Sequence, residues 1–115
     1  MTAFQWHIYQ ADLTPVKGSG QSGTRPVLVI STEEVNEALP VVAVLPLTSL
    51  KPKREIYPTE ALLEAARTGL PMDSIAMAHQ IRTISKSRLA GEYGIIDDEN
   101  LKNSIRMAIK TYLDL

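Results

Sequence analysis

One arginine stands between a glycine-rich segment and a short apolar run. Arg25 follows residues 18–24, Gly-Ser-Gly-Gln-Ser-Gly-Thr, and precedes Pro26 and the apolar residues 27–30. Glycines allow the backbone to take positive φ, whereas a proline fixes its own φ and disfavours helix for the preceding residue. The Arg25 side chain therefore has a fixed root beside an adaptable loop, where a guanidinium can bind phosphate through two hydrogen bonds. An ordinary surface turn fits the same residues, because isolated glycine-rich loops are weak signals.

Hydroxyl, imidazole and amide groups accompany two other apolar runs. Thr48 and Ser49 come directly after a strand-like run, where a hydroxyl could emerge from a rigid element or simply begin a turn. Further along, His79 precedes Gln80 and Arg82, which would share one face of an extended chain. Histidine is the side chain best suited to proton transfer near pH 7, although a single histidine is more often structural.

Composition limits the kinds of site that the chain can build. A length of 115 residues corresponds to a single domain, 1–115, with enough apolar surface for a core. The absence of cysteine and the presence of only two histidines argue against a disulfide scaffold and against a zinc site. We therefore expect no metal and no cofactor, and we expect Arg, Lys, Ser, Thr, His, Tyr or carboxylates to carry the chemistry.

Charge and targeting features bear on partners and on location. The formal net charge of −1 argues mildly against wrapping of nucleic acid by overall charge, but basic residues gather at 51–54 and at 79–88. The amino terminus lacks a basic and apolar leader, and no stretch approaches the roughly 20 apolar residues of a membrane span. We expect a soluble, cytoplasmic protein without membrane contact.

The periodicity of apolar residues predicts several short strands. Alternation over residues 4–13 is typical of a half-buried strand, with Trp6 in the core rather than serving as a stacking platform for bases. Two further strands are predicted at 27–30 and at 41–47, the second interrupted near its end by Pro46. Residues 75–84 predict one long strand or a bent pair of strands.

Helices are predicted at three places, one of them ambiguous. Residues 31–34 form a capping-box start to one or two helical turns that Pro40 would stop. Residues 59–69 could be a helix with Gly69 just beyond its end, or a strand from 56 to about 63. Asp97 or Asp98 would cap an amphipathic terminal helix with one apolar face: Leu101, Ile105, Ala108, Ile109 and Tyr112. Together these elements predict a mainly β (α+β) fold, a small β-barrel with short helices and a C-terminal helix.

Several segments match one family jointly, in order and in spacing. These are residues 6–13, residues 18–30, Leu45-Pro-Leu-Thr-Ser49, Gln80-Ile-Arg-Thr-Ile84 and Lys86-Ser-Arg-Leu89. The chain therefore resembles the MazF/PemK family of toxin endoribonucleases over nearly its whole length. The resemblance implies an SH3-like barrel, a homodimer, and sequence-specific cleavage of single-stranded RNA without a metal or a ribosome. It also implies a MazE-like antitoxin as partner, with DNA contacted only through the antitoxin complex.

The same resemblance assigns roles to residues. It implies that Arg25 and Thr48 are catalytic, promoting attack of the ribose 2′-OH to give a 2′,3′-cyclic phosphate and a 5′-OH. Arginine is a poor general base, and His79, which stands where the family often has an acidic residue, could supply base or acid. The remaining polar groups are candidates for RNA contact: Ser19, Gln21, Ser49, Lys51, Lys53, Gln80, Arg82, Lys86 and Arg88.

Two other functions fit a small barrel less well. A non-enzymatic gyrase poison resembling the CcdB proteins would need a Trp-Gly-Ile carboxyl end, whereas this chain ends Tyr112-Leu-Asp-Leu115. A peptide-binding adaptor would need an aromatic groove, and the few aromatic residues here are scattered along the chain.

Overall fold

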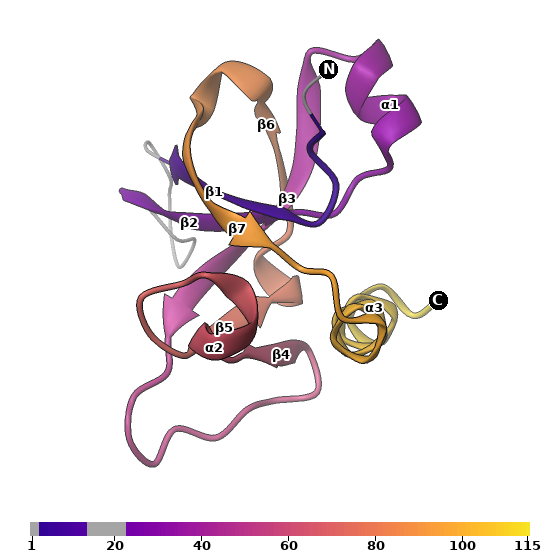
Figure 1. The fold of residues 1–115 in the computed structure, drawn as a ribbon. Coiled ribbons are helices and arrows are strands. Elements are labelled where there is room, and N and C mark those ends of the chain that lie inside the picture. The colour runs from indigo at the N-terminus through magenta and orange to yellow at the C-terminus, as the bar shows by residue number, and fades with distance from the viewer. Residues whose placement is uncertain (1–2, 14–22) are drawn as a thin grey trace.

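Antiparallel strands, seven of them among the described residues, form the framework of the fold (Figure 1). The computed structural model describes residues 3–13 and 23–115. The predicted mainly β fold with short helices and a C-terminal helix is confirmed. In chain order the elements are β1 His7–Asp12, β2 Thr24–Val29, α1 Glu33–Ala38, β3 Val41–Ser49, β4 Glu60–Leu63, α2 Ala65–Thr68, β5 Ser74–Met77, a 3₁₀ turn Ala78–Gln80, β6 Arg82–Ser85, a 3₁₀ turn Lys86–Arg88, β7 Leu89–Ile95 and α3 Glu99–Leu113.

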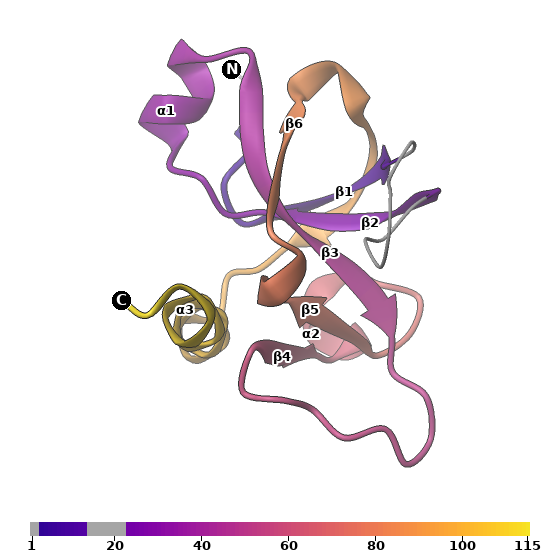
Figure 2. The same ribbon diagram turned by 180° about the vertical axis from the view of Figure 1, so that it is seen from behind.

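The long strand β3 belongs to two sheets, as the view from behind shows (Figure 2). Its first part pairs with β2 and β6, and its last part pairs with β5, which in turn pairs with β4. Pro46 pairs with Val27 and is followed at once by Leu47 opposite Ala76. The prediction that Pro46 interrupts the strand is therefore wrong. Proline cannot donate to a ladder, but here it stands where β3 changes partner.

Strand alternation divides the apolar residues between two buried clusters. In β2, Leu28 faces the first cluster whereas Val27 and Val29 face the second. Both faces of β2 are buried, which explains why residues 27–29 are apolar without alternation. The first cluster joins the strands to α3 (Ile8, Leu28, Leu45, Leu47, Ala61, Leu63, Leu70, Ala76, Ala78, Ile96, Ile105, Ala108), and the second lies among β1, β2, β3 and β6 (Tyr9, Ala11, Leu13, Val27, Val29, Val42, Val44, Ile84).

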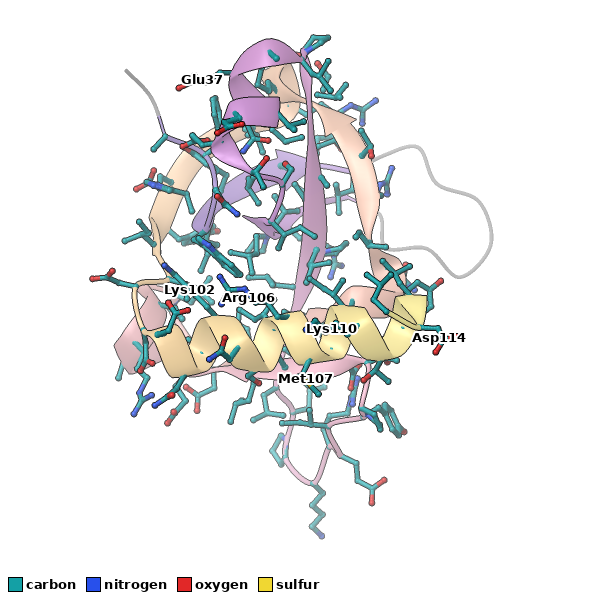
Figure 3. The ribbon with its side chains drawn as sticks, turned by 90° about the vertical axis from the view of Figure 1, so that its right-hand side faces the viewer. Glu37, Lys102, Arg106, Met107, Lys110 and Asp114 are labelled. Carbon is teal, nitrogen blue, oxygen red and sulfur yellow. The ribbon has the colours of Figure 1, made fainter. Side chains whose placement is uncertain are left out.

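The first predicted strand is shorter than its alternation indicates. β1 begins at His7, because Trp6 takes a positive φ of 68° in the turn before it. The Trp6 ring packs against the first cluster as predicted, and Lys102 Nζ and Arg106 Cζ lie 5.6 and 5.2 Å from its centroid. Figure 3 shows Lys102 and Arg106 on the edge of α3 opposite to that of Met107. The alternation of apolar residues from Phe4 onward does not reveal the turn at Trp6.

Glu33 fixes the segment before β1 rather than capping a helix. Its Oε2 accepts a hydrogen bond from Phe4 N at 2.8 Å, and its Oε1 accepts one from Gln5 N at 3.3 Å. Burial acts to raise the pKa of Glu33, but the hydrogen bonds from Phe4 N and from Asn36 outweigh it, so the pKa is lowered. Helix α1 forms before Pro40 as predicted, yet Thr32 at its N-cap makes no side-chain cap bond, so the predicted capping box is wrong.

Both alternatives for residues 59–69 occur, one after the other. Glu60–Leu63 is strand β4, and Ala65–Thr68 is the single turn of α2. Gly69 ends this turn with a φ of 80°, the left-handed conformation that glycine adopts easily. Strand pairing with β5 thus overrides the helical propensity of the first half of the segment.

Residues 75–84 are a bent pair of strands with a break between them. The 3₁₀ turn Ala78–Gln80 separates β5 from β6, so Gln80 precedes the strand that contains Arg82. The prediction that Gln80 and Arg82 share one strand face is therefore wrong. A 3₁₀ turn rotates successive side chains by about a third of a circle, which destroys the alternation of an extended chain.

The C-terminal helix matches its prediction except at its last turn. Asp98 is the N-cap, and its Oδ1 accepts hydrogen bonds from Asn100 N at 2.8 Å and Leu101 N at 3.3 Å. Ile105 and Ala108 are buried, but Tyr112, which was predicted to share their apolar face, is 46% exposed. Among the described residues, no helix combines the length and the apolar character needed to cross a membrane.

Candidate active site

The candidate site opens where β2 and β3 separate. Their ladder ends at Val27 opposite Pro46, and its register would place Arg25 opposite Thr48. Thr48 instead pairs with Ile75 of β5. Because the two strands diverge here, a pocket of about 360 Å³ forms between their ends. Its described lining residues are Arg25, Pro26, Leu47, Thr48, Ser49, Lys51 and Ser74.

The lining of this pocket suits an anion. Arg25 and Lys51 bring two cationic side chains, whereas Thr48, Ser49 and Ser74 bring hydroxyl groups. None of the described lining residues is acidic. Hydrogen bonds between a guanidinium or an ammonium and a phosphate are among the stronger ones in proteins, and hydroxyls can donate to the remaining oxygens. The geometry therefore fits a phosphate group held between the ends of β2 and β3.

Some of these side chains lie on strands and others lie on a connection between strands. Arg25 and Thr48 lie on strands and are half-buried, so their roots are set by the sheet. Lys51 follows β3 on the connection to β4 and is exposed. A site built on strands is positioned more accurately than one built on a loop. The structure thus places Arg25, Thr48, Ser49 and Lys51 together, as four of the predicted site residues.

The imidazole of His79 lies beside Thr59, outside the described lining of the pocket. Its Nδ1 is 3.0 Å from Thr59 Oγ1, and the carbonyl of Thr59 accepts a hydrogen bond from Ala78 N at 2.9 Å. His79 does not belong to the described lining of the pocket. It follows the end of β5 that pairs with Glu60, whereas Ile75 in the same strand pairs with Thr48. Within this chain, the hydrogen-bonding partner of His79 is therefore Thr59, the residue before β4, and not a residue of the pocket.

Four other predicted contact residues lie on β6 or in the 3₁₀ turns before and after it. Arg82 pairs with Val44, four residues before Thr48 on β3. Lys86 Nζ donates to the carbonyl of Asn36 at 2.6 Å, and Arg88 Nη1 donates to the carbonyl of Asp12 at 3.0 Å. None of these three, nor Gln80 in the 3₁₀ turn, lines the described pocket.

The remaining predicted contact residues are Lys53, Ser19 and Gln21. Lys53 is exposed on the β3–β4 connection, with a φ of 64°. Ser19 and Gln21 lie outside the described residues, as does most of the glycine-rich segment that precedes Arg25. Within residues 3–13 and 23–115, no three His, Asp or Glu side chains gather as a possible metal site.

Sequence reasoning missed Ser74 as a pocket residue. Ser74 begins β5 opposite Ser49, is almost fully buried, and donates its hydroxyl to the carbonyl of Met72 at 3.1 Å. A single serine after Asp73 carries no local signal of a site. Only the pairing of β5 with the end of β3 brings it to the pocket, and that pairing is not visible in the sequence.

Comparisons with known sequences agree on one family. Residues 4–113 match the profile of the PemK-like, MazF-like toxins of type II toxin–antitoxin systems. Endoribonuclease EndoA of Bacillus subtilis is 42% identical over 92 residues, which cover 80% of this chain and 78% of that protein. Endoribonuclease MazF of Staphylococcus saprophyticus is 38% identical over 95 residues, which cover 83% of this chain and 78% of that protein.

A solved structure agrees on the fold. The chain resembles a mycobacterial endoribonuclease in complex with its cognate antitoxin, with a TM-score of 0.80 and 24% identity. The match covers 99% of this chain and 97% of that one. The small barrel with a C-terminal helix is therefore an architecture that this protein shares with that endoribonuclease.

Proposed function

The chain belongs to the PemK-like, MazF-like toxins of type II toxin–antitoxin systems, and we propose that it is an endoribonuclease that cleaves single-stranded RNA without a metal ion or a ribosome. The observation that carries this proposal is the pocket in which Arg25 and Thr48 meet beside Lys51, with no acid in its described lining. Relatives named endoribonucleases support it.

The proposed reaction needs only groups that RNA and this pocket supply. The ribose 2′-OH loses its proton and bonds to the adjacent phosphorus, while the bond from phosphorus to the 5′ oxygen of the next nucleotide breaks. That oxygen takes up a proton, so the products are a 2′,3′-cyclic phosphate and a 5′-OH. Arg25 would stabilise the negative charge on the pentacoordinate phosphorus, and Thr48 would donate to a non-bridging oxygen.

The family supports a proposal about the biological setting. We propose a single domain that acts in the cytoplasm as a homodimer, with two equivalent pockets along a groove between the copies. A MazE-like antitoxin would cover that groove. A mycobacterial endoribonuclease with the same fold was solved in complex with its cognate antitoxin, which supports an antitoxin as partner. Sedimentation of the purified protein as a monomer at micromolar concentration would argue against the dimer.

Incubation with a long mixed-sequence RNA in EDTA tests the proposed activity. We expect discrete cuts at a short recurring sequence, each leaving a 5′-OH, as mapped by end-specific ligation. Arg25→Ala and Thr48→Ala should abolish the cuts, whereas Thr83→Ala, which removes an exposed threonine hydroxyl on β6, should leave them unchanged. RNA that stays intact at high protein concentration would argue against the enzyme.

His79 remains our candidate for proton transfer, although it does not line the pocket of its own chain. In that role it would have to act from the second copy in the proposed dimer. We expect His79→Ala to lower kcat by roughly 10²-fold, as is typical for loss of a general acid or base. Added imidazole should restore part of the rate. His7→Ala serves as the control, because His7 Nδ1 is hydrogen-bonded to Glu92 Oε1 on β7 at 2.9 Å. Rates within twofold of wild type would leave His79 with only its hydrogen bond to Thr59.

The gyrase-poison alternative predicts a different result. A poison would cause gyrase-dependent breaks in DNA and leave RNA intact, whereas the proposed enzyme cuts RNA in the absence of gyrase. The endoribonuclease relatives do not favour the poison.

A further inference from the structure

Lys51, the second cationic residue of the pocket, is positioned by the long connection between β3 and β4. Lys51 lies near the start of the segment 50–59, which joins β3 to β4 and projects from the lower part of the molecule (Figure 1). Its side chain is exposed and flexible, with a four-carbon stem. The position of its ammonium group therefore depends on how well the backbone of Lys51 is fixed. The feature that holds this backbone lies outside the pocket and plays no part in the chemistry proposed above.

Arg54 and Glu60 form a paired fork at the base of this segment. Arg54 Nη1 and Nη2 donate to Glu60 Oε1 and Oε2 at 2.9 and 2.8 Å. The side chain of Glu60 is 1% exposed and that of Arg54 is 30% exposed. Two parallel hydrogen bonds between planar groups fix both distance and orientation, which a single ion pair does not.

The charge state of this pair is stable at neutral pH. Hydrogen bonding from Arg54 lowers the pKa of the Glu60 carboxyl, outweighing burial, which acts to raise it. Hydrogen bonding to Glu60 correspondingly raises the pKa of Arg54. A carboxyl with a lowered folded-state pKa contributes stability above its unfolded-state pKa and loses it as the pH falls through the folded-state value. The fork is therefore intact under the conditions of the proposed reaction.

Backbone hydrogen bonds carry this fixed geometry to Lys51. Arg54 N donates to the carbonyl of Lys51 at 3.1 Å, so the residue held by the fork also closes the turn that begins at Lys51. On the other side, Leu50 N donates to the carbonyl of Asp73 at 2.9 Å. The backbone of Lys51 is thus held from the β5 side and from the fork.

A second set of contacts closes the far half of the segment onto the same carboxylate. Tyr57 N donates to Glu60 Oε1 at 3.0 Å, and Glu60 N donates to the carbonyl of Tyr57 at 2.9 Å. The guanidinium of Arg54 lies 5.1 Å from the centroid of the Tyr57 ring, within the range of a cation–π contact. One buried carboxylate therefore organises both halves of the connection.

We propose that Arg54 and Glu60 are positioning residues that hold Lys51 at the pocket, so that a phosphate of the substrate RNA meets two cations rather than one. This inference rests on the proposed RNA cleavage. Burial of an ion pair is weak evidence for stability by itself, whereas its demand for one geometry suits a positioning role. Arg54 and Glu60 do not line the pocket and need not touch RNA.

A double-mutant cycle between Arg54 and Lys51 tests the proposal. The substrate is a short RNA that contains a cleavage site mapped with the wild-type protein. Lys51→Ala should raise KM about tenfold with little change in kcat, since it removes one charged contact to phosphate. Arg54→Met should raise KM by a similar factor. The double variant should be no worse than Lys51→Ala alone, because Arg54 acts through Lys51.

Matched variants separate positioning from loss of charge and from unfolding. Arg67→Met removes another ion-paired arginine, whose Nη1 lies 2.9 Å from Asp98 Oδ2, and should leave KM unchanged. Arg54→Lys keeps the charge but loses the fork, so its KM should lie between the wild-type value and that of Arg54→Met. Far-ultraviolet circular dichroism at the assay temperature verifies folding, and Glu60→Gln, which keeps the shape of the carboxyl, offers a second route to the same KM change.

Each outcome of this experiment decides something different. Absence of cleavage by the wild type would overturn the proposed function and this inference with it. Cleavage by the wild type together with an unchanged KM in Arg54→Met and Glu60→Gln would overturn the inference alone. Multiplicative effects of Arg54→Met and Lys51→Ala would also overturn it, since independent residues act additively in free energy.

Discussion

Arg25→Ala is expected to lower the rate constant of RNA cleavage by about 10³-fold or more, the effect of removing a preorganised charge from a transition state. Arg25 is half-buried at the end of β2 and faces the same pocket as Thr48. Its root is fixed by strand pairing with Ala11 of β1, so its charge requires little reorganisation as the phosphorane forms. The measurement is a single-turnover rate at saturating protein on an RNA with a mapped cleavage site, which separates chemistry from binding.

The comparison with Arg25→Lys isolates the shape of the guanidinium. Lysine keeps the positive charge but cannot donate two parallel hydrogen bonds, so we expect an intermediate loss of about 10²-fold. Arg67→Ala, which removes an exposed arginine of α2, should have almost no effect on the rate. A rate constant for Arg25→Ala within tenfold of wild type would contradict the assignment of Arg25 to the transition state.

Arg25 and Thr48, which line one pocket, could be proposed as a candidate pair from the sequence because their signals are local or shared with a family. Arg25 follows a glycine-rich segment and precedes proline, and Thr48 ends an apolar run. Each signal is weak alone, and their joint occurrence with the other family segments makes them specific. The fold class followed from the many short apolar runs and from the capped terminal helix. These features depend on residues close together in the chain, where propensity and periodicity are informative.

Long-range pairing accounts for most of what the sequence did not reveal. Strand β7 was not predicted, because Gly91 and Gly94 lower its local propensity and only its ladder with β1 makes it a strand. Ser74 reaches the pocket through pairing with Ser49, and Glu60 is a strand residue because β4 pairs with β5. Such contacts depend on tertiary structure, which overrides local preference.

One close backbone contact ties β7 to the turn of α2. A Cβ added to Gly94 would lie 2.2 Å from the carbonyl oxygen of Thr68, and one added to Gly69 would lie 2.5 Å from that of Tyr93. Both obstacles are backbone atoms, which cannot rotate away as a flexible side chain can. The two glycines therefore allow α2 and β7 to approach more closely than any other residues would.

Gly94→Ala is accordingly expected to destabilise the protein by about 3 kcal/mol or more, at or beyond the upper end of the usual cost of overpacking. For a domain of this size such a loss corresponds to a fall in Tm of roughly 10 °C. Gly91→Ala is the matched control, because it makes the same change in the same strand with no atom within 4 Å of the added Cβ. Its effect should stay within about 0.5 kcal/mol of zero.

Urea unfolding followed by the fluorescence of Trp6, the single tryptophan, gives the free energy of unfolding for each variant. Thermal unfolding by circular dichroism gives Tm independently. The contact lies between α2 and β7, neither of which contributes a described lining residue to the pocket. Gly94→Ala that remains folded at low temperature should therefore still cleave RNA there. Equal stability of the two alanine variants would show that α2 shifts away from β7 at little cost, and that the close approach of Gly69 and Gly94 does not hold this part of the fold together.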